Sequence, residues 1–265
     1  MVIRSEPVLI SVMSGKGGTG KTVISACISI YLAKQNKKTV VVDADCIFSD
    51  LDVALGIEGE FTYNSFDILL ERCEFEDALH KVYEDKELYF LPSSRQDNVF
   101  DFNEIAFIEI LRKVKSNFDY VIVDCPTNKE IAKKLQAVSD MIIVITCPDV
   151  LSVRNSDSLI SILEDENADI RLLINKFNNN EKFSELFMTP DKILDELGIK
   201  LIGVVPESKE FIKMINSSGL SLFESETTLS CVFENISKRI MGENAPLANF
   251  EEKPKTKKMK LFNKR

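Results

Sequence analysis

The sequence has a single histidine, His80, and no two cysteines close enough to form a CxxC motif. The usual zinc sets need several such ligands at short spacings, so no zinc site is expected. His80 lies in a polar stretch that we expect to be helical and exposed. We interpret the cysteines as reduced thiols, most of them packing residues: Cys27, Cys46, Cys73, Cys125, Cys147 and Cys231.

Long apolar runs are also absent, and none approaches the roughly 18–20 residues that a membrane-spanning helix needs. The first seven residues lack the apolar stretch of a secretory signal. With 265 residues, 45% of them hydrophobic and 28% charged, the chain suits one large α/β domain or at most two small ones. These features favour a protein of the cytosol.

Net positive charge is lacking as well, except at one end. The chain has 33 basic and 42 acidic residues, a net charge of −9, which argues against a general nucleic-acid binder. Residues 253–265, however, contain seven basic side chains and no acidic one, which leaves a net charge of −16 on residues 1–252. An acidic body with a basic tail indicates that the tail meets an anionic surface.

Apolar segments typical of strands alternate along the chain with helical patterns. The strands are expected at residues 8–12, 39–42, 88–91, 120–123, 141–146, 172–174 and 201–205. The helices are expected at residues 22–34, 103–115, 129–138, 152–163, 190–197, 207–215 and 227–241. Several strands are continuously apolar, as in a parallel sheet that is buried on both faces. This pattern predicts a three-layer α/β fold with a mostly parallel, twisted sheet of about seven or eight strands and helices on both faces.

A glycine-rich loop follows the first expected strand and leads into the first expected helix. From Gly15 to Thr22 it matches the pattern G-x-x-x-x-G-K-[ST]. Glycines let backbone N–H groups approach phosphate oxygens, and the helix N-terminus adds partial positive charge. Lys21 would neutralise the β- and γ-phosphates, and the Thr22 hydroxyl would bind magnesium.

Two further strands end in carboxylates at the edge of the sheet where open α/β sheets bind their ligands. Asp43 and Asp45 follow the strand at residues 39–42, and Asp124 follows the strand at residues 120–123. An aspartate in this position often serves only as a helix cap. Two such strands together with a phosphate loop favour magnesium binding.

The string KGGTGKT, with its additional Lys16, resembles the deviant Walker A P-loop ATPases. Within them the chain resembles the MinD family of division-site ATPases over nearly its whole length. The stretches that carry this likeness include VVDADCIFSDLDVALGIE, ELYFLPSSRQDN, FDYVIVDCP, CPDVLSVRNSD, IKLIGVVPES and MGENAPL. The resemblance implies an ATP-bound homodimer in which Lys16 reaches the partner's nucleotide.

The resemblance also implies roles for individual residues. Lys16, Lys21 and Asp45 would serve hydrolysis, with Asp45 positioning the attacking water. Thr22, Asp43 and Asp124 would serve the magnesium ion. The residues assigned to nucleotide binding are Gly15, Lys16, Gly17, Gly18, Thr19, Gly20, Lys21, Thr22, Val23, Asn175, Pro206 and Glu207. Asn175 and the loop at Pro206 would contact the adenine, although a plain strand-end turn and a helix N-terminus explain these two nearly as well.

The implied working cycle uses the two parts of the chain differently. Residues 1–242 would form the ATPase domain, and residues 243–265 a linker and a basic amphipathic tail. Met259, Leu261 and Phe262 among the lysines of residues 257–265 would bind an anionic membrane weakly, and a dimer would bind it more firmly through avidity. The dimer would recruit a MinC-like division inhibitor, and a MinE-like activator or another topological factor would stimulate release. A disordered solubilising tail is the alternative.

Two segments depart from the family pattern. Ser49-Asp50 stands where the family usually has Arg-Asn, and Asp124-Cys125-Pro126-Thr127-Asn128 stands where it has Asp-Ser-Pro-Ala-Gly. Loss of that glycine is expected to stiffen the loop. These departures motivate one alternative, a nucleotide-binding scaffold with little hydrolysis. Two relatives that share the fold are further alternatives: a ParA-type DNA-partitioning ATPase, against which the charge of −16 weighs, and a flagellar-number regulator of the FlhG type.

Overall fold

The computed structural model describes residues 6–45, 49–57, 59, 61–93, 104–163, 169–178, 187–211 and 227–247. Its centre is an eight-stranded sheet in the order β3-β4-β2-β5-β1-β6-β7-β8. Only the β3–β4 pair is antiparallel among these strands. The strands are β1 (Val8–Met13), β2 (Thr39–Asp43), β3 (His80–Lys81), β4 (Leu88–Leu91), β5 (Tyr120–Asp124), β6 (Met141–Thr146), β7 (Asp169–Phe177) and β8 (Lys200–Pro206).

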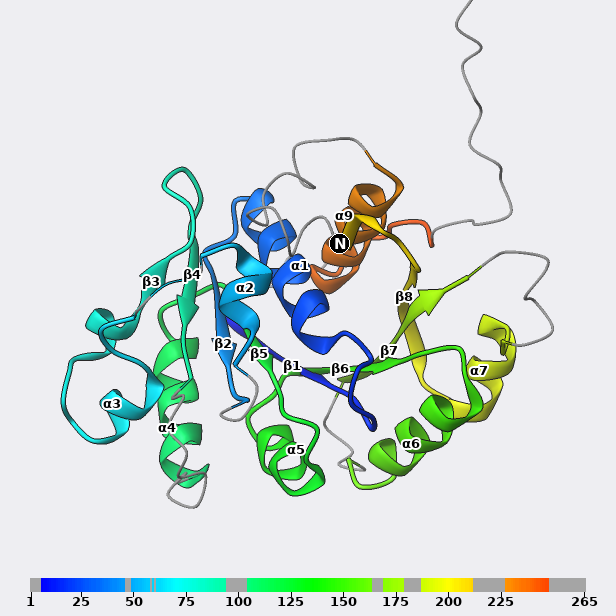
Figure 1. Ribbon diagram of the computed structural model, residues 1–265, viewed down its shortest axis with the longest axis horizontal. Helices are drawn as coiled ribbons and strands as arrows, with labels where there is room; N and C mark the ends of the chain where they lie inside the picture. Colours follow the sequence, from blue (N-terminus) through cyan, green and yellow to red (C-terminus); the bar gives the residue numbers. More distant parts are fainter. Residues whose placement is uncertain are drawn as a thin grey trace, which may run out of the picture.

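Helices cover both faces of the sheet, which confirms the predicted three-layer fold. In Figure 1, α1, α2 and α9 lie above the sheet, and α4, α5, α6 and α7 lie below it. The helices are α1 (Lys21–Lys34), α2 (Leu51–Leu55), α3 (Ser65–Leu69), the 3-10 turn η1 (Phe75–Ala78), α4 (Glu104–Lys115), α5 (Lys129–Gln136), α6 (Val150–Ile160), α7 (Pro190–Leu197) and α9 (Thr228–Ile240).

Strand β1 divides its side chains between two apolar cores. Ile10 and Val12 belong to the core beneath α1 and α9, and Leu9 and Met13 belong to the core beneath α4 and α5. Successive strand side chains point to opposite faces, so a strand that is covered on both sides must be apolar at every position. The continuous apolar runs of the sequence have this cause.

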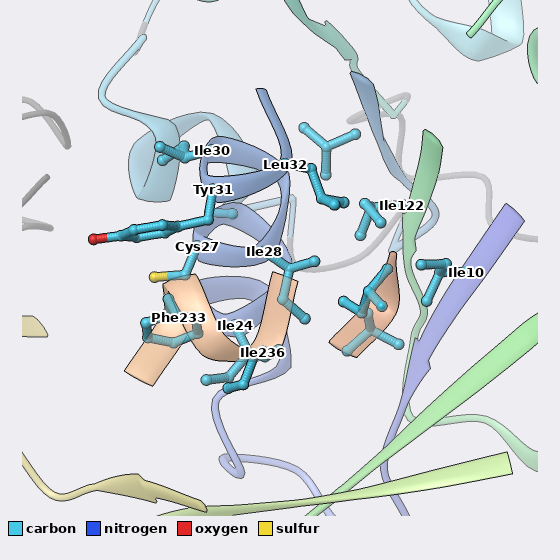
Figure 2. Packing of buried hydrophobic residues seen from close by; sticks show 14 of the residues in the cluster. Ile10, Ile24, Cys27, Ile28, Ile30, Tyr31, Leu32, Ile122, Phe233 and Ile236 are labelled. Atoms are coloured by element: carbon cyan, nitrogen blue, oxygen red, sulfur yellow. The ribbon is translucent and has the colours of Figure 1, made fainter. Parts of the chain in front are cut away.

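Helix α1 is buried around nearly its whole circumference, with residues 24–33 all buried. It lies between the sheet, α2 and α9, and a helix in such a place needs apolar or small side chains on every face. Figure 2 shows Ile24 and Cys27 of α1 beside Phe233 and Ile236 of α9. The first turn of α1 is therefore fixed firmly at the edge of the sheet, directly after the phosphate loop.

Helices of about one turn and a two-residue strand were not predicted, because one turn is too short to show the 3.6-residue periodicity and two residues show no alternation. These are α2, α3, η1 and β3. The prediction for His80 was wrong: it lies in strand β3, is half-buried, and its Nε2 is 3.2 Å from the Tyr63 carbonyl oxygen. The Phe61 ring lies 4.6 Å from the His80 ring. The helix expected at residues 207–215 lies partly outside the described residues. Cys46 and residues 248–265 lie wholly outside them.

The five cysteines in the described residues are all free thiols, as predicted. Of these described residues, no helix combines the length and the apolar character needed to cross a bilayer.

Candidate nucleotide-binding site

The sheet order brings the predicted site residues to one edge. Strands β2, β5, β1, β6 and β7 are consecutive neighbours, and all of them are parallel. Their carboxyl ends therefore lie side by side, with the phosphate loop in the middle because it leaves from β1. Asp43 and Asp124 lie on one side of this loop. On the other side, Asp149 follows β6 and Asn175 lies near the end of β7.

The phosphate loop, residues 14–20, joins β1 to α1. The Ser14 hydroxyl donates a 2.8 Å hydrogen bond to the Lys16 carbonyl, and Gly20 takes a φ of 92° at the N-cap of α1. No side chain caps this helix, and its first turn has no acidic residue. Helix N-termini attract anions through free N–H groups and partial positive charge, so this end of α1 fits a phosphate.

Two side chains from β7 hold the loop from behind. Asn175 Nδ2 donates to the Thr19 carbonyl, and Lys176 Nζ donates to the Gly18 carbonyl, each at 2.7 Å. In a trans peptide the C=O and N–H point in opposite directions. Fixing these two carbonyls toward β7 therefore turns the following N–H groups, of Thr19 and Gly20, away from β7. Lys176 has a φ of 57°, which is uncommon for a residue with a side chain.

Two buried carboxylates lie on neighbouring strands beside the loop. Asp43 and Asp124 are register partners in the β2–β5 pair and are 1% and 2% exposed. Asp43 accepts hydrogen bonds from the Ser49 hydroxyl at 2.8 Å and from the Asp45 N–H at 2.9 Å. Asp124 accepts one from the Ser25 hydroxyl at 3.0 Å.

Burial disfavours the ionised form of these two carboxyl groups. It raises the pKa of Asp124 to about 6, although a hydrogen bond from Thr22 and the charge of Lys21 act in the opposite direction. Burial, followed by the nearby charge of Asp124, raises the pKa of Asp43 well above its usual range. A divalent cation between the two carboxylates would remove this repulsion.

The groups present fit a nucleotide with magnesium. Within the described residues, the Thr19 hydroxyl is buried without a hydrogen-bond partner, in a loop that carries Lys16 and leads directly into Lys21 of α1. No cluster of three or more His, Cys, Asp or Glu that could hold a metal alone occurs in this part of the chain. Magnesium usually takes one or two carboxylates together with phosphate oxygens and waters, and that set matches Thr22, Asp43 and Asp124.

Lys16 forms an ion pair within its own chain. Its Nζ lies 3.6 Å from Asp149 Oδ1, and both side chains are about two-fifths exposed, at 43% and 39%. Asp149 also accepts a hydrogen bond from the Ser152 N–H at the start of α6. A cavity of about 230 Å³ opens beside them, lined by Lys16, Gly17, Gly18, Thr19, Cys147, Pro148, Asp149, Ser152, Lys176, Phe187 and Glu207.

The remaining predicted residues lie around this centre. Val23 is partly buried and packs its side chain against the core beneath α1 and α9. Pro206 ends β8, and the Glu207 N–H donates to the Phe177 carbonyl at 2.9 Å. Glu207 lines the cavity, whereas Asn175 lies behind the loop. Their contacts with adenine stay predictions.

Four residues of the site were not assigned a role from the sequence. Ser25 binds Asp124, Asp149 pairs with Lys16, Lys176 holds Gly18, and Thr127 accepts a 2.7 Å hydrogen bond from Lys21. The rule that ligands gather at the carboxyl ends of parallel strands would have pointed to Asp149, which follows β6. The same rule points to Lys176, near the end of β7, and to Thr127, after β5, whereas the contact of Ser25 depends on the packing of α1 against β5.

Comparisons with known proteins agree with this geometry. A family model described as an AAA domain matches residues 8–175. The septum site-determining protein MinD of Bacillus subtilis is 35% identical over 251 residues, 93% of each chain. The solved MinC:MinD cell division protein complex of Aquifex aeolicus matches with a TM-score of 0.81 and 27% identity, over 91% of this chain and 98% of that one. Septum site-determining MinD of Pyrococcus horikoshii, solved with Mg-ADP, has a TM-score of 0.77 at 23% identity and covers 88% of this chain and 95% of that chain. The chain therefore belongs to the MinD family of P-loop ATPases.

Proposed function

We propose that this chain is a division-site ATPase that dimerises with ATP, binds the inner membrane surface as a dimer, and leaves it after hydrolysis. The observation that carries this proposal is the phosphate loop with Lys16 and Lys21 beside Asp43 and Asp124 at the ends of adjacent strands. The solved P. horikoshii relative with Mg-ADP supports nucleotide and magnesium binding. The A. aeolicus MinC:MinD complex supports a MinC-like partner.

In this proposal the loop binds the triphosphate through its N–H groups, the N-terminus of α1 and the Lys21 ammonium. Asn175 and Lys176 keep these N–H groups oriented by holding the carbonyls on the other side of the loop. Thr22, Asp43 and Asp124 hold magnesium, which when bound neutralises charge on the phosphates. The adenosine end lies toward the cavity that Glu207 and Phe187 line.

Hydrolysis is expected to be slow in the isolated chain. Asp45, half-buried after β2, is the residue proposed to position the attacking water. Phosphoryl transfer depends mainly on positioning and electrostatic stabilisation. In the dimer, Lys16 of the second copy would approach the phosphates and add electrostatic stabilisation. A MinE-like activator or other topological factor would stimulate hydrolysis further.

Liposome sedimentation tests the membrane step. The full chain and a chain ending at Glu252, which lacks the basic tail, are mixed with anionic vesicles and Mg2+ plus a non-hydrolysable ATP analogue or ADP. We expect pelleting of the full chain with the analogue only, because one weak tail holds poorly and two hold by avidity. Equal pelleting of both chains would rule out a role of the basic tail in membrane binding. A salt-dependent shift of DNA instead would favour a ParA-type function.

Asp149→Asn is expected to strengthen the dimer modestly. The substitution frees Lys16 from its partner within the chain, while asparagine still caps α6. Exposed ion pairs contribute up to about 1 kcal/mol, so we expect up to about a five-fold lower dimer dissociation constant with the ATP analogue. Sedimentation velocity measures it, with Lys16→Ala, which loses the dimer contact itself, as the comparison. A weaker dimer in Asp149→Asn would show that the ion pair is not competing with dimerisation.

A further inference from the structure

The hydroxyl of Thr127 contacts the lysine of the phosphate loop. Lys21 Nζ donates a 2.7 Å hydrogen bond to Thr127 Oγ1, across 106 positions of sequence. Thr127 lies in the turn between β5 and α5, directly beyond Asp124. The family pattern has alanine at this position, and alanine has no side chain that could accept this bond.

The turn that carries Thr127 is held at both ends. On one side, the buried Cys125 donates its N–H to the Val12 carbonyl at 3.2 Å. On the other, the Asn128 side chain caps α5 by accepting from the N–H groups of Glu130 and Ile131, at 2.9 and 3.2 Å. The Asn128 N–H also donates to the Pro126 carbonyl at 2.8 Å. The Thr127 side chain is exposed, and its hydroxyl is presented by a turn whose backbone is held at both ends by these hydrogen bonds.

Its partner is fixed in the same way. Lys21 is the first residue of α1, whose following turns are buried on nearly all sides. A lysine ammonium has three N–H donors and a flexible stem with many rotamers. Holding one donor on Thr127 leaves two for phosphate oxygens and removes rotamers that would otherwise have to be lost on binding.

We propose that Thr127 is a positioning residue for Lys21, so that the turn after β5 contributes to triphosphate affinity through a side-chain hydroxyl. This inference rests on the proposed nucleotide site. Because Lys21 serves the β- and γ-phosphates, the contribution is larger for a triphosphate than for a diphosphate. Movement of the turn, for example on partner binding, would then change how tightly the loop holds its nucleotide.

The test compares Thr127→Val, which keeps the shape and removes the hydroxyl, with Thr127→Ser, which keeps the hydroxyl. Dissociation constants for a fluorescent non-hydrolysable ATP analogue and for fluorescent ADP are measured with Mg2+ by titration. We expect Thr127→Val to weaken analogue binding about three- to ten-fold and ADP binding less, and Thr127→Ser to stay within about two-fold of the wild type. Melting temperatures in the absence of nucleotide check that each variant folds, and Thr127→Ala, the family residue, serves if the valine does not fit.

A double-mutant cycle separates positioning from a general structural effect. In a Lys21→Met background, Thr127→Val should change ADP affinity no further, because the amine that it positions is gone. Wild-type affinity in both Thr127→Val and Thr127→Ala would overturn the inference and leave the proposed function intact. Absence of saturable nucleotide binding in the wild-type chain would overturn both.

Discussion

Asp124→Asn is expected to stabilise the fold at pH 7 in EDTA while removing magnesium-dependent turnover. The carboxyl is 2% exposed, and burial raises its pKa to about 6. Between pH 4 and pH 6 the unfolded chain releases this proton and the folded chain keeps it, so the free energy of unfolding falls as the pH rises through this window. A shift of about two pH units corresponds to roughly 3 kcal/mol, part of which asparagine recovers.

Urea titrations of both proteins at pH 4, 5, 6 and 7 measure this effect. The difference in unfolding free energy, variant minus wild type, should be smallest at pH 4 and reach about 1–3 kcal/mol at pH 7. Removal of the charge also lowers the pKa of Asp43, which Asp124 helps to raise, and this adds to the gain. Asp157→Asn, at an exposed position of α6, is the control and should show no such trend. A difference that does not change with pH would contradict the argument.

The gain in stability expected for Asp124→Asn has the same cause as the suitability of the site for a cation, namely the burial of negative charge. Two buried carboxylates on adjacent strands, with the charge of Asp124 acting on Asp43, reduce the stability of the protein when no cation is present. Such an arrangement is tolerated when binding requires it. Ser25, Ser49 and the Asp45 N–H offset part of the cost by hydrogen bonding to the carboxylates.

The sequence was sufficient for the parts of the structure that depend on local patterns. The continuous apolar run at β1 predicted a strand that is buried on both faces, and Ile10 and Leu9 do lie in opposite cores. The glycine-lysine string predicted a loop between this strand and a helix, and it lies there. Each of these features is decided within about fifteen residues, by side-chain periodicity and backbone freedom.

Pairings between distant residues could not be predicted in the same way. Lys16 with Asp149, Lys21 with Thr127 and Ser25 with Asp124 depend on which strands are neighbours and on how each turn leaves its strand. Asn128 shows the difference for a single residue. The missing glycine was expected to stiffen the loop, and Asn128 lies in extended backbone, with a φ of −135°, as the N-cap of α5. Left-handed freedom is not required there.

Gly15→Ala is expected to disrupt the phosphate loop more than any other single methyl group added to it. A Cβ at Gly15 would lie 2.1 Å from the carbonyl oxygen of Asn155 and 2.3 Å from its carbonyl carbon. Both atoms belong to the backbone of α6, so no side-chain rotation relieves the contact, and the loop or the helix must move by about 1 Å. Overpacking of this kind typically costs about 1–3 kcal/mol, which corresponds to roughly 5- to 150-fold in an equilibrium constant.

We therefore expect nucleotide affinity to fall by roughly ten- to one hundred-fold in Gly15→Ala, together with a lower melting temperature. Gly17→Ala is the matched control for stability, because no heavy atom of the described chain lies within 4 Å of a Cβ at Gly17. Fluorescent-nucleotide titration and thermal melts of both variants give the comparison. If Gly15→Ala melted and bound nucleotide like the wild type, the loop would not be packed against α6. Helix α6 also carries Asp149 at its N-cap, so a shift of α6 in Gly15→Ala should weaken the Lys16–Asp149 ion pair as well. Adding Asp149→Asn to Gly15→Ala should then change the dimer dissociation constant less than Asp149→Asn does alone.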